Sequence, residues 1–179
     1  MENKENNKKY PKGIIIIHWL TVILLALVFY RGMSLEDIEF NEANISIYRA
    51  HAIPGMLILI ITLVRIFIKR KNKENLPKEI EYYSFIHKAV VETVNKFIYV
   101  LLILTPLMGF IMIYQTGALS YDFGGPFPKG AELNEILEIL HKVFVFSLLS
   151  LVVIHVLGVI IYKFKKGENL LRRMCHLLK

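Results

Sequence analysis

The sequence predicts an all-α fold, a transmembrane four-helix bundle with both termini in the cytoplasm. Three observations predict it. The chain of 179 residues is 55% hydrophobic, it contains four long apolar runs, and the segments that connect these runs alternate in charge. A soluble domain of this length cannot bury so large an apolar fraction. Residues 1–179 are therefore expected to form a single membrane domain.

The four apolar runs are long enough to cross a bilayer. They cover residues 14–30, 52–68, 97–114 and 143–162. A membrane-spanning helix needs about 17–25 mainly apolar residues, and each run meets this length. Because backbone polar groups cannot stay unpaired in lipid, the runs are predicted to be helices. No small-residue cleavage site follows the first run, so it is expected to remain as a span rather than act as a signal peptide.

The connecting segments alternate in charge. Lysine and arginine dominate the N-terminal segment, the connection between the second and third runs, and the C-terminal tail, whereas the other two connections are mainly acidic. The positive-inside rule then places both termini in the cytoplasm. The basic residues flank the spans and form no motif for reading bases, so nucleic-acid binding is not expected.

Four histidines lie inside or at the edges of the apolar runs. In the predicted topology His18 and His155 lie toward the cytoplasm, whereas His51 and His141 lie toward the outside. An ionisable side chain in a membrane segment is costly, so it indicates a functional site by default. Any one of them alone is also compatible with an interfacial polar group. Their matched depths in two pairs favour a shared role.

The spacing of His141 and His155 is the most informative part of this pattern. They are 14 residues apart in one run, which gives a rise of about 21 Å and returns the side chains to within about 40° of one direction. One helix thus presents two imidazoles to the bundle interior. Helix bundles hold cofactors through facing side chains, and neutral imidazole is a good axial ligand for haem iron. The sequence therefore predicts two haems, one between His18 and His155 and one between His51 and His141.

Other residues are candidates to support these sites. Gly55, one turn after His51, would let a porphyrin approach the helix backbone, although small residues also help membrane helices to pack. Arg65, near the cytoplasmic end of the second span, either pairs with a propionate of the inner haem or extends its head group to water. His87 precedes the third span without a histidine at its level. It is expected to be a surface histidine, with a proton relay as the alternative.

Three cations lie at the outer rim, near the predicted outer haem. They are Arg31, Arg49 and Lys142. They are candidates to hold propionates or to draw an anion toward the haem edge. The alternative is that they offset the acidic residues of the outer connections.

These features together resemble the bacterial cytochrome b561 family of four-span di-haem membrane proteins. The similarity covers roughly Tyr10 to Met174. It rests on the order and spacing of several short motifs, since no single motif is specific. The pieces are IHWLT around His18, H-x3-G at His51 and Gly55, LVRI at Arg65, P-x2-G at Pro106 and Gly109, His141 with His155, and the closing NLLRRM.

The resemblance implies a multi-pass protein of the bacterial inner membrane, with two b-type haems held by the same two histidine pairs. The best-understood branch of the family oxidises superoxide on the outer side and passes electrons to ubiquinone. Similar subunits elsewhere exchange electrons between quinone and a hydrogenase, a dehydrogenase or a periplasmic carrier. The chain departs from some relatives at Asn95 and at Ile161-Tyr162, where those relatives carry histidines. The resemblance therefore carries no quinone or proton role over to these positions.

The favoured function is therefore an oxidoreductase that transfers electrons from superoxide to ubiquinone, with Arg31, Arg49 and Lys142 attracting the anion. Two imidazoles fill both axial positions of each iron, so single-electron transfer is expected rather than oxygen activation. Two alternatives stay open. One is an electron-transfer subunit docked to a separate redox protein. The other is a haem-free proton or metal transporter that uses the same histidines.

Overall fold

The computed structural model describes residues 9–77 and 79–175, and helices are the regular secondary structure within them. The elements are α1 (Lys12–Met33), α2 (Ile45–Lys71), η1 (Lys73–Asn75), α3 (Phe85–Gln115), α4 (Leu119–Asp122), α5 (Glu135–Lys166) and η2 (Leu170–Met174). The helices α1, α2, α3 and α5 are long and apolar enough to cross a membrane. The predicted all-α transmembrane bundle is thus confirmed as a fold class.

The ends of the long helices follow from local side-chain chemistry. The Ser84 hydroxyl accepts a hydrogen bond from the His87 backbone amide at the start of α3, and the Asn134 side chain does the same for Leu137 at the start of α5. These contacts satisfy amide groups that have no partner inside the helix. Gly167 ends α5 with a φ of 71°, a left-handed conformation that glycine adopts without steric cost. With 32 residues, α5 is longer than the roughly 20 residues that span a bilayer.

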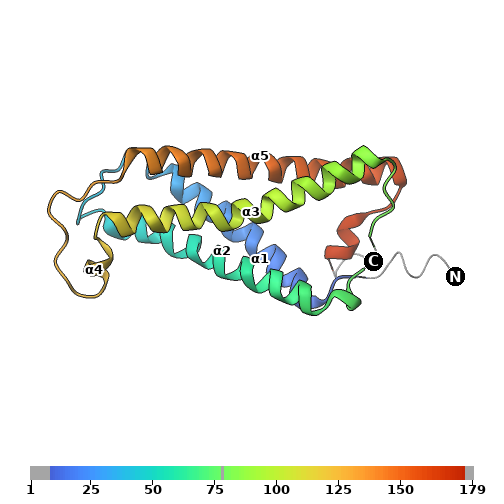
Figure 1. Cartoon of the computed structure of the whole chain (residues 1–179), viewed down its shortest axis with the longest axis horizontal. Helices are drawn as coiled ribbons and strands as arrows, with labels where there is room; N and C mark the ends of the chain where they lie inside the picture. The colour runs from blue at the N-terminus through green and yellow to red at the C-terminus, as the bar shows by residue number, and fades with distance from the viewer. Residues whose placement is uncertain (1–8, 78, 176–179) are drawn as a thin grey trace.

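Sequential packing of the long helices brings the bundle together. The closest backbone packing joins α1 to α2, α2 to α3, and α3 to α5. At its centre a buried cluster joins α2, α3 and α5 through Ile58, Leu101, Leu102 and Leu148. Toward the end that carries the chain termini, α1 and α2 diverge from α3 and α5, and η2 lies in the space between them (Figure 1). We call this the terminal end of the bundle.

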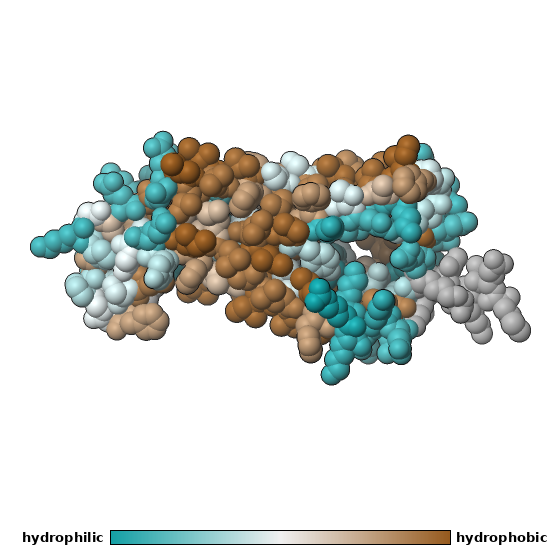
Figure 2. All heavy atoms as spheres, viewed as in Figure 1, coloured by the Kyte–Doolittle hydropathy of each residue, from teal (hydrophilic) through white to brown (hydrophobic). Residues whose placement is uncertain are grey.

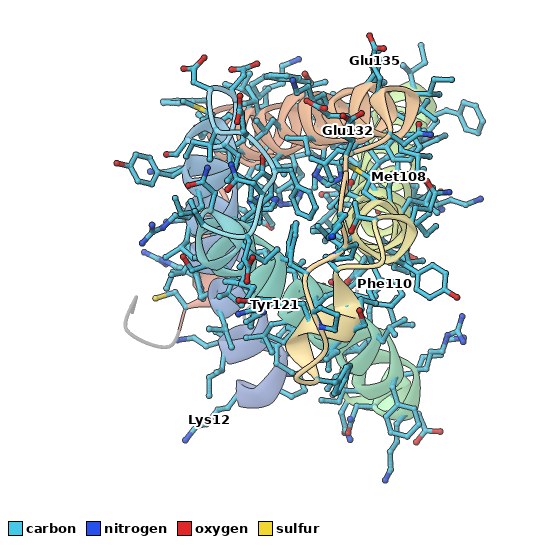
Figure 3. The ribbon with its side chains drawn as sticks, turned by 90° about the vertical axis from the view of Figure 1, so that its left-hand side faces the viewer. Lys12, Met108, Phe110, Tyr121, Glu132 and Glu135 are labelled. Atoms are coloured by element: carbon cyan, nitrogen blue, oxygen red, sulfur yellow. The ribbon has the colours of Figure 1, made fainter. Side chains whose placement is uncertain are left out.

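The opposite end, which we call the α4 end, is closed by the connections between helices. Ile45, Tyr48 and Ala118 are buried there against the apolar side chains of the two loops. The Tyr48 hydroxyl donates a hydrogen bond of 2.6 Å to the Ile38 carbonyl and so ties α2 to the first loop. Figure 3 looks at the bundle from this end, with Tyr121 in front of the helices.

The surface of the bundle matches a lipid environment. Large apolar side chains are exposed on all four long helices, including Leu27, Ile60, Phe110 and Val153. Figure 2 shows apolar surface over the middle of the molecule and hydrophilic surface at both ends. Such a large exposed apolar area is costly in water and favourable in a bilayer.

The central cluster predicts a pair of substitutions with opposite outcomes. Ile58 is 2% exposed and Ile60, on the same helix, is 55% exposed. Ile58→Ala should leave a cavity that destabilises the bundle by about 2–5 kcal/mol, whereas Ile60→Ala removes lipid-facing atoms and should change stability little. Thermal unfolding of the detergent-solubilised protein measures both. Equal shifts in the two midpoints would contradict the assignment of the core.

Candidate functional site

His51 and His141 face each other near the α4 end. His51 lies in the second turn of α2 and His141 in the second turn of α5, and their ring centres are 6.2 Å apart with planes at 77°. Two imidazoles bound to opposite sides of one metal ion have ring centres roughly 6 Å apart, since each metal–nitrogen bond is about 2 Å long and the ring centre lies about 1 Å behind the nitrogen. The spacing of this pair therefore fits two ligands of one iron.

The His51 ring is held by the backbone of the neighbouring helix. Its Nδ1 lies 2.9 Å from the Val28 carbonyl oxygen in α1. A carbonyl only accepts, so Nδ1 must carry the proton and Nε2 keeps its lone pair. Metal-ligating histidines commonly donate the other ring N–H in this way, which fixes the tautomer and the ring orientation.

Two glycines lie directly against these rings. A Cβ atom added to Gly32 in α1 would lie 2.9 Å from Cε1 of His51, and one added to Gly109 in α3 would lie 3.4 Å from Cε1 of His141. In contrast, a Cβ on Gly55 would meet no atom within 4 Å. The structure thus assigns a close approach to Gly32 and Gly109 and leaves open space beside Gly55.

His18 and His155 form a second pair, nearer the terminal end. His18 lies in α1 and His155 in α5, and the two side chains are close enough to interact electrostatically with each other and with Arg65. Nδ1 of His18 is buried, and no group in the described part of the chain lies in hydrogen-bonding position to it. Burying a polar nitrogen without a partner is costly, so His18 offers a free ligand atom to a bound group.

Arg65 lies beside this second pair. Its guanidinium carbon is 5.5 Å from the centre of the Tyr99 ring. Its Nε is buried, with no hydrogen-bond partner among residues 9–77 and 79–175. Nearby Tyr10 interacts with Arg65 and with Arg173; burial raises the pKa of the Tyr10 hydroxyl, and the two arginines oppose that shift. A cation in this position suits an anionic group such as a propionate.

The C-terminal segment closes the terminal end, which the sequence did not reveal. Arg173 in η2 is only 8% exposed. Its carbonyl accepts a hydrogen bond of 3.1 Å from the Tyr10 amide, and the Met174 carbonyl accepts one of 2.8 Å from Trp19 Nε1. The closing NLLRRM run was the available signal, but nothing in the run itself predicts that Arg173 is buried.

The outer-rim cations differ in their surroundings. Lys142 forms ion pairs with Glu138 at 3.0 Å and with Glu36 at 3.6 Å, so two carboxylates offset its charge. Arg49 lies over the Tyr121 ring, with its guanidinium carbon 5.3 Å from the ring centre. Arg31 is exposed in the last turn of α1. Lys142 is thus less well placed than the exposed Arg31 to act on an anion.

His87 belongs to neither histidine pair. It stacks on Tyr83 with ring centres 3.8 Å apart and lies 6.1 Å from the ring of Tyr162. Tyr162 is itself 1% exposed and donates a hydrogen bond of 3.3 Å to the Glu81 carbonyl. His87 is therefore half-exposed and part of an aromatic cluster that joins the start of α3 to the end of α5 at the terminal end.

Each of the two sites offers two histidines, which suits a metal ion that a cofactor already holds through other ligands. Within residues 9–77 and 79–175, no group of three or more His, Cys, Asp or Glu side chains is arranged to hold a metal ion. Two imidazoles alone bind a free ion weakly, but they complete the coordination of an iron that a porphyrin already holds through four nitrogens. The residues present therefore fit haem better than a bare metal ion.

Comparison with known proteins agrees with this chemistry. The family described as prokaryotic cytochrome b561 matches residues 9–176. A protein of Yersinia pestis named "Probable superoxide oxidase CybB" is 24% identical over 172 residues, which cover 94% of this chain and 96% of that protein. The chain belongs to the prokaryotic cytochrome b561 family, and it is a multi-pass bacterial membrane protein with b-type haem and a role in electron transfer.

Proposed function

We propose that the chain is a di-haem oxidoreductase that oxidises superoxide at the α4 end and reduces a quinone such as ubiquinone. The opposed rings of His51 and His141, 6.2 Å apart, carry the proposal. A second pair, His18 on α1 and His155 on α5, lies at the other level and supports two haems rather than one. The likeness to a probable superoxide oxidase along almost the whole chain supports the choice of substrate.

The reaction balances with single electrons. Two superoxide ions each give up one electron and leave as O2, and one quinone takes up two electrons and two protons to form the quinol. When bound, haem supplies an iron that accepts and donates one electron at a time. His51 with His141 would hold one haem and His18 with His155 the other, and two histidine ligands on each iron would keep oxygen from binding to it.

In this proposal the α4 end faces the outside and the termini lie in the cytoplasm. The positive-inside rule supports this orientation, because the basic segments gather at the terminal end. Arg31 and Arg49 would then raise the local concentration of superoxide at the α4 end. Lys142 contributes less, because Glu36 and Glu138 offset its charge. At the terminal end, Arg65 would pair with a propionate of the inner haem.

Two other functions are separated by simple observations. A haem-free proton or metal transporter would give colourless protein, and the lack of a three-ligand cluster in the described part of the chain disfavours a metal site of that kind. An electron-transfer subunit would need its redox partner. Purified protein that reduces a quinone analogue under a flux of superoxide, with nothing else added, supports the oxidoreductase.

The haem content of histidine variants tests the pairing. His155→Ala and His141→Ala should each lose one of two haems, about half of the total, because each removes one axial ligand of a different iron. His87→Ala should keep both, since His87 lies in neither pair. Pyridine haemochrome assays and reduced-minus-oxidised spectra give the stoichiometry. Full haem in both ligand variants would rule out the assigned pairs.

The charges at the α4 end predict a salt-dependent rate. Replacing Arg31 and Arg49 together by glutamine should slow superoxide oxidation by about tenfold at low ionic strength and by much less at high salt, because salt screens the attraction. Lys142→Gln should slow it less. Lys163→Gln removes one positive charge, as Lys142→Gln does, but at the opposite end of α5, and it should have no effect. Rates that are unchanged in the double arginine variant would remove these residues from the mechanism.

Arg65 predicts a shift in one reduction potential. A positive charge near the iron favours the reduced state, which carries one negative charge more. Arg65→Gln should therefore lower the midpoint potential of the haem held by His18 and His155 and leave the other unchanged. Arg70→Gln, on an exposed side chain of the same helix, is the matched control. Potentiometric titration of both variants decides the matter, and equal shifts would indicate only a long-range effect of charge.

A further inference from the structure

We propose that Gly32 is a positioning residue for the haem at the α4 end. It leaves room for the His51 ring to lie against the backbone of α1, where the Val28 carbonyl orients that ring. The inference rests on the proposed di-haem function. Gly32 is not itself a ligand. Its place beside His51 sets the tautomer, the ring plane and the basicity of that ligand.

Gly32 lies in close contact with the His51 ring. The three atoms nearest to a Cβ built on Gly32 are all in the His51 ring, with Cε1 at 2.9 Å, Nδ1 at 3.3 Å and Nε2 at 3.9 Å. A Cβ–carbon distance under 3.0 Å is shorter than van der Waals contact allows. A glycine that served only the packing of two helices would instead face the backbone of the neighbouring helix. Gly32 faces an imidazole.

The Val28 carbonyl, which accepts the hydrogen bond from His51, lies one helical turn before Gly32. Val28 precedes Gly32 by four residues, so the two lie on the same face of α1, one turn apart. The Val28 carbonyl points along the helix toward Gly32, and His51 Nδ1 reaches it at 2.9 Å. We call this pairing of a carbonyl and a glycine four residues later the imidazole seat. A side chain at position 32 would occupy the space through which the ring reaches the carbonyl.

A second seat lies across the pair on α3. Thr105 and Gly109 are also four residues apart, and His141 lies against both of them. A Cβ on Gly109 would have the His141 atoms Cε1 at 3.4 Å and Nδ1 at 3.7 Å as its nearest neighbours. His141 also interacts with the Thr105 backbone, although its Nδ1 is not within hydrogen-bonding geometry of a described residue. Both rings thus lie against a glycine that follows a contacted residue by four positions, but only the His51 ring makes the hydrogen bond.

The seat has a consequence for the iron. A hydrogen bond from Nδ1–H makes Nε2 more basic, and a more basic ligand stabilises the oxidised iron. Gly32→Ala must push the His51 ring away from Val28, weaken this bond and turn the ring from its present angle of 77° to His141. The haem at the α4 end should then shift to a higher midpoint potential, and its low-spin ferric resonance should move.

The experiment compares three alanine variants of the full-length, haem-loaded protein. Gly32→Ala introduces the closest contact, Gly109→Ala an intermediate one, and Gly13→Ala, on the same helix as Gly32, meets nothing within 4 Å. Electron paramagnetic resonance and potentiometric titration resolve the two haems, and His141→Ala identifies the signals of the α4-end haem by removing them. We expect the shifts to be largest for Gly32→Ala, smaller for Gly109→Ala and absent for Gly13→Ala, with the other haem unchanged throughout.

Several outcomes would overturn the inference. They are unmoved signals in Gly32→Ala, equal movement of both haems, and a shift in Gly13→Ala as large as in Gly32→Ala. If Gly32→Ala does not accumulate as folded protein, Gly109→Ala decides, because its contact is milder and should still move the α4-end haem alone. Wild-type protein without haem would sink the proposed function as well, whereas two intact haems with unmoved signals would sink this inference only.

Discussion

A polar imidazole inside a lipid-covered bundle must find a partner, and the arrangement of the long helices reflects that requirement. Water cannot reach such a ring to solvate it, so each nitrogen needs a hydrogen bond or a metal. His51 satisfies one nitrogen with the Val28 carbonyl of α1, and its ring centre lies 6.2 Å from that of His141. Because α5 supplies one histidine at each level, the orientation of this single helix governs both sites.

The two ends of the bundle meet this requirement differently. At the α4 end, glycines on α1 and α3 bring the imidazoles close to backbone, and a loop cluster around Tyr48 seals the site. At the terminal end the helices diverge, and η2 lies between them as the closing element (Figure 1). Arg65 is the cation next to the second pair. One site is thus shaped mainly by backbone contacts and the other by charge.

This difference suits a chain that moves electrons in one direction. A hydrogen-bonded, more basic ligand stabilises oxidised iron, whereas a nearby cation stabilises reduced iron. The haem at the α4 end would then release electrons readily, and the haem at the terminal end would hold them more strongly. Both effects favour transfer from superoxide at the α4 end toward the terminal end, which is the direction the proposed function requires.

The sequence by itself determined the fold class, because lengths of apolar sequence and the cost of unpaired backbone in lipid leave helices as the solution for four such runs. It also indicated the two histidine pairs, since a 14-residue spacing returns side chains to one face of a helix. Only the tertiary structure showed that Gly32, rather than Gly55, lies against His51, that Arg173 is buried, and that Glu36 and Glu138 offset Lys142. Apart from the Glu138–Lys142 pair, whose members lie four residues apart within α5, each of these contacts joins segments far apart in the chain, and periodicity within one helix carries no information about which neighbour it meets.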